Sequence, residues 1–277
     1  YIYFLMLYSI LVETYKELEK TTKRLEKTYL ISELLKKTST EDLETVTLLV
    51  QGNIFPTYDQ REIGIASRLI LKALSQTSGI EQKHVENSWA SIGDLGEVAE
   101  ELIKKKKQAT LHSENLTIKK VMTNLRKLAD LTGAGTVERK LQLIRELLSS
   151  AKPAEARYII RTLIGDLRIG AAEGTIRDAI AWAFFPPVGS IFFECPNCKS
   201  WMPKIKKCLN CGKDMNLKSG PETRGRKILE IKETEEIEKK NIQNYDLIQA
   251  KDETEARKTY NHLLDIIQRA INLSNDM

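Results

Sequence analysis

Apolar residues recur every three or four positions along most of the first 186 residues, and this period constrains the fold more than any other feature. From Ser9 to Lys37 the positions between the apolar residues hold mainly Lys, Glu, Arg and Thr. This pattern predicts one long amphipathic helix. Runs that alternate with the period of two typical of strands are absent from this region. The first 186 residues are therefore predicted to be all-α.

Shorter helical segments follow, and several begin at residues typical of helix starts. Thr117 and Thr136 stand where N-caps are expected, and Pro153 stands where a first helical turn is expected. The predicted helices run over 39–50, 65–76, 81–89, 96–107, 117–131, 136–148, 153–164, 175–185 and 253–271.

Composition is that of a soluble globular protein, with 277 residues, 42% hydrophobic and 29% charged. The net charge of +5 is too small to establish a nucleic-acid partner by itself. The apolar start, residues 1–12, is shorter than the roughly 20 residues that span a bilayer, so no membrane anchor is expected. We expect the sequence to be a fragment, with Met6 as a possible natural start and an abrupt end at Met277.

All four cysteines lie within one short stretch, as two C-x-x-C pairs with nine residues between them: Cys195, Cys198, Cys208 and Cys211. Four thiolates at this spacing satisfy tetrahedral Zn²⁺ and leave no open position for catalysis, which predicts a structural zinc ribbon over about 190–218. Two redox disulfides or an iron–sulfur site are the alternatives. The clustering is typical of a reducing compartment, so we expect a cytoplasmic protein.

The function of the ribbon is open at this point. Its lysines and Trp201 are compatible with a nucleic-acid surface. Docking of a partner protein, or simple stabilisation of the fold, explains them equally well.

Two stretches of the helical region resemble each other, residues 61–73 and 167–179. Each places an Arg shortly before Ile-Gly, then small residues, then an apolar helical segment. A third glycine turn covers 132–136. A glycine turn that leads into a helix exposes backbone N–H groups to an anion, although the same glycines also suit tight turns between helices.

Longer stretches carry a family resemblance: Leu116-Thr-Ile-Lys-Lys-Val, Leu131-Thr-Gly-Ala-Gly-Thr-Val-Glu-Arg-Lys, and Ala156-Arg-Tyr-Ile-Ile-Arg-Thr-Leu-Ile-Gly-Asp-Leu-Arg-Ile-Gly. They closely resemble the N-terminal DNA-binding domain of archaeal ATP-dependent DNA ligases. The resemblance covers about 6–185 and 253–277. It predicts a helical domain of residues 6–186 and 253–277, interrupted by an insertion at 187–252 that holds the ribbon and a charged linker.

The resemblance implies an all-α, pseudo-twofold domain that encircles nicked double-stranded DNA through backbone contacts in the minor groove. Such a domain would act in DNA replication, repair and recombination, with a sliding clamp as a possible partner of the full-length protein. The residues expected to bind DNA phosphates are Arg61, Gly64, Ser67, Gly133, Gly135, Thr136, Arg161, Arg168, Gly170, Gly174, Thr175 and Arg177.

The chain departs from the family in lacking the Lys-x-Asp-Gly motif, whose lysine forms the covalent lysyl-AMP intermediate. No catalytic residue is therefore assigned, and the chain alone should not seal nicks. ATP and Mg²⁺ are expected only in a full-length ligase. A free-standing DNA-binding or protein-recruiting adaptor, or an RNA-binding zinc-ribbon protein, are the alternative functions.

Overall fold

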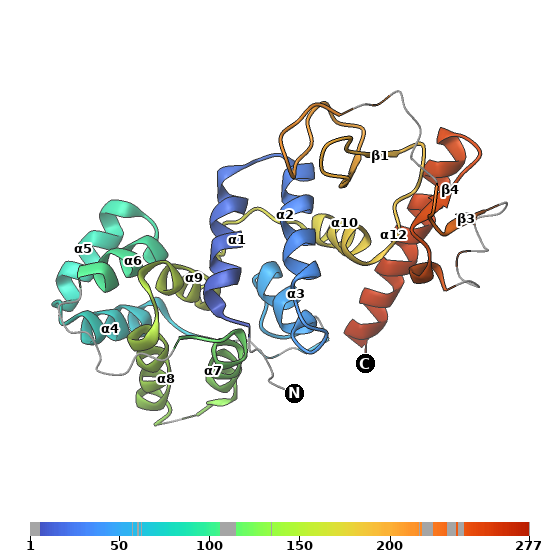
Figure 1. The fold of residues 1–277 in the computed structure, drawn as a ribbon. Coiled ribbons are helices and arrows are strands. Elements are labelled where there is room, and N and C mark those ends of the chain that lie inside the picture. Colours follow the sequence, from blue (N-terminus) through green and yellow to red (C-terminus); the bar gives the residue numbers. More distant parts are fainter. Residues whose placement is uncertain are drawn as a thin grey trace. The chain divides into compact units, whose positions relative to one another are not determined.

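A computed structural model describes residues 6–56, 58, 59, 61, 63–105, 115–133, 135–215, 217, 224–231, 237 and 241–276, with the backbone alone for 272–276. The chain folds as two compact units (Figure 1). Unit 1 holds residues 1–22 and 37–172, and unit 2 holds 23–36 and 173–277. Helices dominate the described residues of both units, which confirms the predicted all-α class.

The regular elements described in unit 1 are all helices, apart from one antiparallel bridge between Leu7 and Thr117. Its helices are α1 (Tyr8–Lys20), α3 (Leu43–Gln51), α4 (Ser67–Ser78), α5 (Gln82–Ile92), α6 (Leu95–Lys105), α7 (Ile118–Asp130), α8 (Val137–Ser150) and α9 (Pro153–Leu163). Unit 2 contains α2 (Arg24–Lys36), α10 (Glu173–Phe184), β1 (Phe192–Glu194), β2 (Trp201–Pro203), β3 (Ile228–Glu230), η1 (Ile242–Asn244), β4 (Leu247–Gln249) and α12 (Glu253–Asp276).

The prediction of one long helix from Ser9 to Lys37 was wrong. The chain leaves the helix at Thr21, whose backbone is extended (φ −124°, ψ 142°), and α1 and α2 belong to different units. Two adjacent β-branched residues, Thr21 and Thr22, weaken the helix here. The apolar period continues across the break, and periodicity alone could not reveal it.

Of the helix starts predicted at Ser39, Thr117 and Thr136, the first is wrong and the other two are confirmed. The helix expected from Ser39 begins at Leu43, because Ser39 forms a turn in which its carbonyl accepts the Asp42 N–H at 2.9 Å. Thr117 caps α7 as predicted and accepts the Lys120 N–H at 3.2 Å. Thr136 is the N-cap residue of α8 as predicted, but its hydroxyl donates to the Gly133 carbonyl at 2.9 Å and makes no cap hydrogen bond. Of the predicted segments, residues 106, 107, 216, 218 and 277 and most of the charged run 233–240 lie outside the described residues.

A close approach of α6 and α9 forms the centre of unit 1. Gly96 makes it possible, since a Cβ there would lie 2.7 Å from Arg161 Cγ and 2.8 Å from the Arg157 carbonyl oxygen. Fully buried Tyr15 of α1 and Tyr158 of α9 pack against each other with ring centroids 4.9 Å apart and ring planes tilted by 48°. Any larger residue at 96 would push the two helices apart.

A buried ion pair joins the same helices. The Arg161 guanidinium, 3% exposed, donates to Asp94, 4% exposed, through Nη2 at 2.7 Å and Nε at 3.1 Å, and its Nη1 donates to Glu19 on α1. The Asp94 carboxylate also accepts the backbone N–H groups of Gly96 (2.8 Å) and Glu97 (3.1 Å) at the start of α6. One carboxylate therefore caps a helix and binds a buried arginine.

Burial acts to raise the pKa of the Asp94 carboxyl, but hydrogen bonds from Arg161 and Glu97 outweigh it and hold the pKa below its ordinary value. A depressed folded-state pKa contributes stability that is present above the unfolded value of about 3.9. That contribution is lost as the pH falls through the folded value.

Unit 2 contains two pairs of short strands besides its helices. Strands β1 and β2 form an antiparallel hairpin, and β3 and β4 pair in parallel. Helix α12 packs on α10, and its buried residues Ala256, Leu263 and Ile267 share a core with Leu229 of β3 and Ile248 of β4. The predicted insertion 187–252 thus folds together with α2, α10 and α12, and its division from a 6–186 and 253–277 domain stays a prediction.

We predict that Arg161→Met lowers the free energy of unfolding of unit 1 by about 3–5 kcal/mol, because it leaves a buried carboxylate without its main partner. Lys20→Met is the matched control: its ion pair with Glu17 is 68% and 49% exposed and should contribute at most about 0.5 kcal/mol. Urea unfolding followed by circular dichroism measures both. Equal losses for the two variants would contradict a central role for the buried pair.

Candidate metal centre and candidate nucleic-acid interface

The cysteines lie on two tight turns beside the β1–β2 hairpin. In the first turn the Lys199 N–H donates to the Cys195 carbonyl at 3.0 Å, and in the second the Gly212 N–H donates to the Cys208 carbonyl at 2.9 Å. Lys199 and Gly212 follow the last cysteine of each pair, and both have left-handed backbones (φ 61° and 71°). The two turns are therefore structurally equivalent, although only the glycine was recognisable in the sequence.

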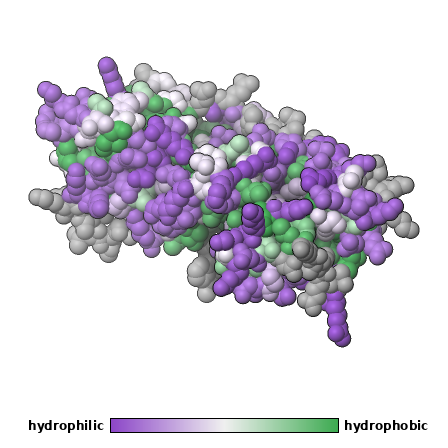
Figure 2. Space-filling view, turned by 90° about the horizontal axis from the view of Figure 1, so that it is seen from above, coloured by the Kyte–Doolittle hydropathy of each residue, from purple (hydrophilic) through white to green (hydrophobic). Residues whose placement is uncertain are grey.

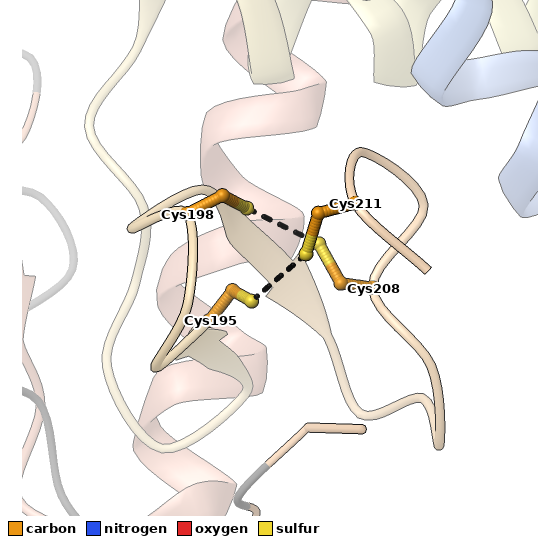
Figure 3. A group of neighbouring side chains, drawn as sticks. All are labelled: Cys195, Cys198, Cys208 and Cys211. Carbon is orange, nitrogen blue, oxygen red and sulfur yellow. Dashed lines mark hydrogen bonds between the residues drawn. The ribbon is translucent and has the colours of Figure 1, made fainter. Parts of the chain in front are cut away.

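The four Sγ atoms converge on one point (Figure 3) and lie within 4.8 Å of one another. Cys195 Sγ is 3.6 Å from Cys211 Sγ, and Cys198 Sγ is 3.6 Å from Cys208 Sγ. A tetrahedral ion with Zn–S bonds of about 2.3 Å requires sulfur separations of about 3.8 Å, whereas a disulfide requires about 2.05 Å. These side chains fit a single ion and are not disulfide-bonded.

The cysteines differ in how far their surroundings favour the thiolate, the form that binds metal: burial raises the pKa of Cys208, whereas the pKa of Cys211 is lowered. The backbone N–H of Lys213 is the largest of the causes that lower the pKa of Cys211. The β1–β2 hairpin connects the cysteine site to the rest of unit 2. Met202 of β2 and Met215 pack with Cys195 and Cys208 in a small core, and Tyr29 of α2 packs against this core. The cysteine site is thus part of the packing of unit 2.

Two of the three predicted phosphate-binding turns are neighbours in unit 1. Arg61 precedes the turn at Gly64 (φ 53°) and donates through Nη1 to Asp130, just before the turn that holds Gly133 and Gly135. Gly64 and Ser67 line a shallow groove of about 570 Å³ together with Gly52–Pro56, Asp59, Arg61, Ile63, Ile65 and residues 162–165, which precede Arg168 in the chain. The structure therefore brings the Gly64 turn close to Asp130 and to residues 162–165, all of which are distant from it in the sequence.

The internal repeat extends to an acidic residue that the sequence argument missed. Arg61 Nε and Nη2 donate to Asp59, two residues earlier, at 3.0 and 2.6 Å. Arg168 Nε donates in the same way to Asp166 at 2.6 Å. Both turns thus contain an Asp-x-Arg pair ahead of the left-handed glycine, and the shared Asp-x-Arg spacing was the available signal.

The arginines predicted to bind phosphate differ in how much of the guanidinium group is exposed and free of hydrogen bonds. Arg161 is buried and engaged by carboxylates, so its guanidinium supports the fold and does not reach the surface. Arg61 is 51% exposed, but its Nε, Nη1 and Nη2 already donate to Asp59 and Asp130. Arg168 is 46% exposed and bonds to Asp166 through Nε and to Asp94 through Nη1 at 3.1 Å. Its Nη2 has no partner among the described residues.

The remaining predicted residues lie at the start of α10 in unit 2. Gly174 and Thr175 are in its first turn, and the Thr175 side chain is buried. Arg177 is 24% exposed and lies 3.4 Å from Asp178, which also pairs with Arg24 of α2 at 2.7 Å. A Cβ on Gly174 would lie 3.5 Å from Arg24 Nη2, an ordinary van der Waals distance, so packing alone does not require glycine here.

Comparison with known protein families shows which family this chain belongs to. The family described as "DNA ligase N terminus" matches residues 7–181, from the beginning of α1 into α10. The chain belongs to the DNA ligase N-terminal family.

Individual relatives agree. DNA ligases of Thermococcus onnurineus and Methanosphaera stadtmanae are 44% and 46% identical over 179 and 180 residues. A DNA ligase of Nitrosopumilus maritimus is 39% identical over 179 residues. The matches cover 64–65% of this chain but 30–32% of each relative, so the chain spans about a third of the length of the ligases it matches.

The family match includes every predicted phosphate-binding residue and ends before the four cysteines. The predicted resemblance of 253–277 to a later helix of the ligase domain is not covered by it and stays a prediction. The described helices include none that is both long and apolar enough to cross a bilayer.

The geometry of the two cysteine turns gives a test of the metal centre. Gly212→Val forces a β-branched residue into a left-handed backbone, which costs about 1–2 kcal/mol, although nothing lies within 4 Å of the added Cβ. We expect this variant to release its metal at lower chelator concentration than the parent.

Lys199→Gly is the matched control, since it removes a side chain from the equivalent left-handed position and should leave metal retention equal or stronger. Zinc release to a colorimetric chelator measures both. Unchanged retention in Gly212→Val would show that the second turn does not hold the ion.

Proposed function

We propose that this chain is the DNA-binding part of an ATP-dependent DNA ligase, and that it grips nicked duplex DNA through minor-groove backbone contacts in replication, repair and recombination. Membership of the DNA ligase N-terminal family supports the proposal. The observation that carries it is Arg168: a half-exposed guanidinium fixed by Asp94 and Asp166 beside a left-handed glycine, Gly170.

The fixed position of Arg168 is what makes it suitable for phosphate. Its Nε and Nη1 are held by carboxylates, so the orientation of the guanidinium plane is set before DNA arrives. Binding then costs little side-chain entropy, and Nη2 is the donor left for a phosphate oxygen. The Arg61 side chain is more fully engaged, so we assign it the weaker contact.

The glycine turns provide the second kind of contact. Gly64, Gly133 and Gly170 all have left-handed backbones, and a helix begins within four residues of each of them. Backbone N–H groups at such places bind phosphate oxygens without regard to base sequence. We propose that Ser67, Gly135 and Thr136 contribute to the turns in unit 1, and Gly174, Thr175 and Arg177 to the start of α10.

The metal proposed for the four cysteines is a structural Zn²⁺. When bound, it cross-links the two turns and supplies no open coordination position for chemistry. Nick sealing, with ATP and Mg²⁺, would belong to the part of a full-length ligase outside this sequence. A sliding clamp is a possible partner of that protein, which would act on DNA inside the cell.

Salt dependence tests the proposal. We expect a dissociation constant for a nicked duplex in the micromolar range or weaker, rising steeply with salt because bound phosphates release counterions. Fluorescence anisotropy between 50 and 200 mM salt measures the slope. Affinity that does not change with salt would contradict backbone binding, and no binding to DNA at all would favour the protein-recruiting adaptor.

A double variant tests the proposed contact. Arg168→Ala with Gly170→Ala should reduce the slope of log K against log salt by about 1, the value of one phosphate contact, and weaken all DNA sequences alike. Arg257→Ala removes an exposed arginine that pairs with Glu253 and should leave the slope unchanged. An unchanged slope in the double variant would remove this turn from the interface.

A further inference from the structure

Unit 2 contains a pocket that the proposed backbone contacts do not use. Its volume is about 270 Å³, and it lies between α2, α10, α12 and the β1–β2 hairpin. Pockets for drug-sized ligands start at about 300 Å³, so this one suits a single small group. Hydrophobic side chains reach the surface in places among mainly hydrophilic ones (Figure 2).

Aromatic side chains are concentrated in this pocket. The chain has 9 Tyr, 6 Phe and 3 Trp, and two of the three Trp line the pocket. The aromatic residues of its wall are Tyr29, Trp182, Phe185, Phe192, Trp201 and Tyr260. Such a concentration in a chain with 6% aromatic residues favours a ligand with a flat, polarisable face.

The aromatic walls are held in place by one another. Phe192 stands edge-on to Trp182 with centroids 5.7 Å apart, and it lies 5.3 Å from the Tyr260 ring. Trp182 Nε1 donates to the Tyr260 hydroxyl oxygen at 3.0 Å. The pocket is therefore preformed, which reduces the entropy that a ligand must overcome.

One polar group of the wall is available to a ligand. Burial raises the pKa of Tyr260, so its hydroxyl keeps its proton, and the oxygen already accepts from Trp182. The hydroxyl hydrogen has no acceptor among the described residues. A ligand with a ring nitrogen or a carbonyl oxygen would satisfy it.

Charge nearby favours an anionic polymer. Residues 195–215 hold five Lys and a single acidic residue, Asp214. The acidic residue in the pocket wall, Glu33, is paired with Lys36 at 2.8 Å. Arg226 lies over the Trp201 ring, 5.3 Å from its centre, and is paired with Glu194 at 2.7 Å, so the excess positive charge is that of the lysines. A purely apolar peptide segment would offer this positive charge no anionic partner.

We propose that the pocket receives one unpaired nucleobase of a bound DNA, with the ring stacked against Trp182 or Trp201 and hydrogen-bonded to the Tyr260 hydroxyl. This proposal rests on the proposed DNA binding and adds a preference for an unpaired base. It also assigns a function to the cysteine turns, because they hold in place the β2 strand that supplies Trp201 and Met202 to the wall.

The test uses three duplexes of one sequence: fully paired, with one unpaired thymidine, and with an abasic sugar in place of that thymidine. The abasic bulge keeps the distortion of the backbone and removes the ring. Stacking of one base contributes about 1–3 kcal/mol, so the thymidine bulge should bind at least about fivefold more tightly than the abasic bulge.

Variants test whether the preference for the thymidine bulge over the abasic bulge arises at this pocket. Trp182→Ala and Trp201→Ala should abolish it, while Trp89→Ala, in unit 1, should keep it. Tyr260→Phe retains the ring and the fold and should reduce the preference without changing metal content, which guards against loss of folding in the Trp variants.

Equal affinity for the two bulges would overturn the nucleobase proposal while the fully paired duplex still binds. Quenching of tryptophan fluorescence by an apolar peptide in that case would assign the pocket to a protein. A preference that survives both Trp variants would place the base elsewhere. Failure to bind any of the three duplexes would instead contradict the proposed function.

Discussion

The buried Asp94–Arg161 pair is the contact on which the rest of unit 1 depends. Asp94 starts α6, Arg161 lies on α9 and reaches Glu19 on α1, and Arg168 bonds to the same carboxylate from the following turn. A buried charge without its partner is costly, so the three helices and the turn must be placed together. The proposed phosphate contact at Arg168 is thus fixed by the packing of the core.

The helical class, most helix positions and the cysteine site could be predicted from the sequence because each depends on local spacing. The break at Thr21 could not, since the apolar period runs through it and only tertiary packing separates α1 from α2. The role of Arg161 was also hidden. A basic residue near a glycine turn suggests a surface contact, and its acidic partner Asp94 lies 67 residues earlier in the chain.

The turns proposed to bind phosphate illustrate the same limit. Sequence comparison within the chain paired the two glycine turns, and the structure adds that each contains an arginine held by an aspartate two residues before it. Nearly neutral turns of this kind bind anions through oriented donors more than through excess charge. This agrees with a net charge of only +5. Beyond residue 181, where the family match ends, the cysteine turns extend unit 2 and complete an aromatic pocket.

The central claim is that this chain binds the sugar-phosphate backbone of DNA without reading its sequence. Hydroxyl-radical footprinting of two nicked duplexes with unrelated sequences tests it most directly. The account predicts protection of sugars on both strands, offset across the minor groove and centred on the nick in each duplex. Protection of one sequence alone, or of neither, would contradict it.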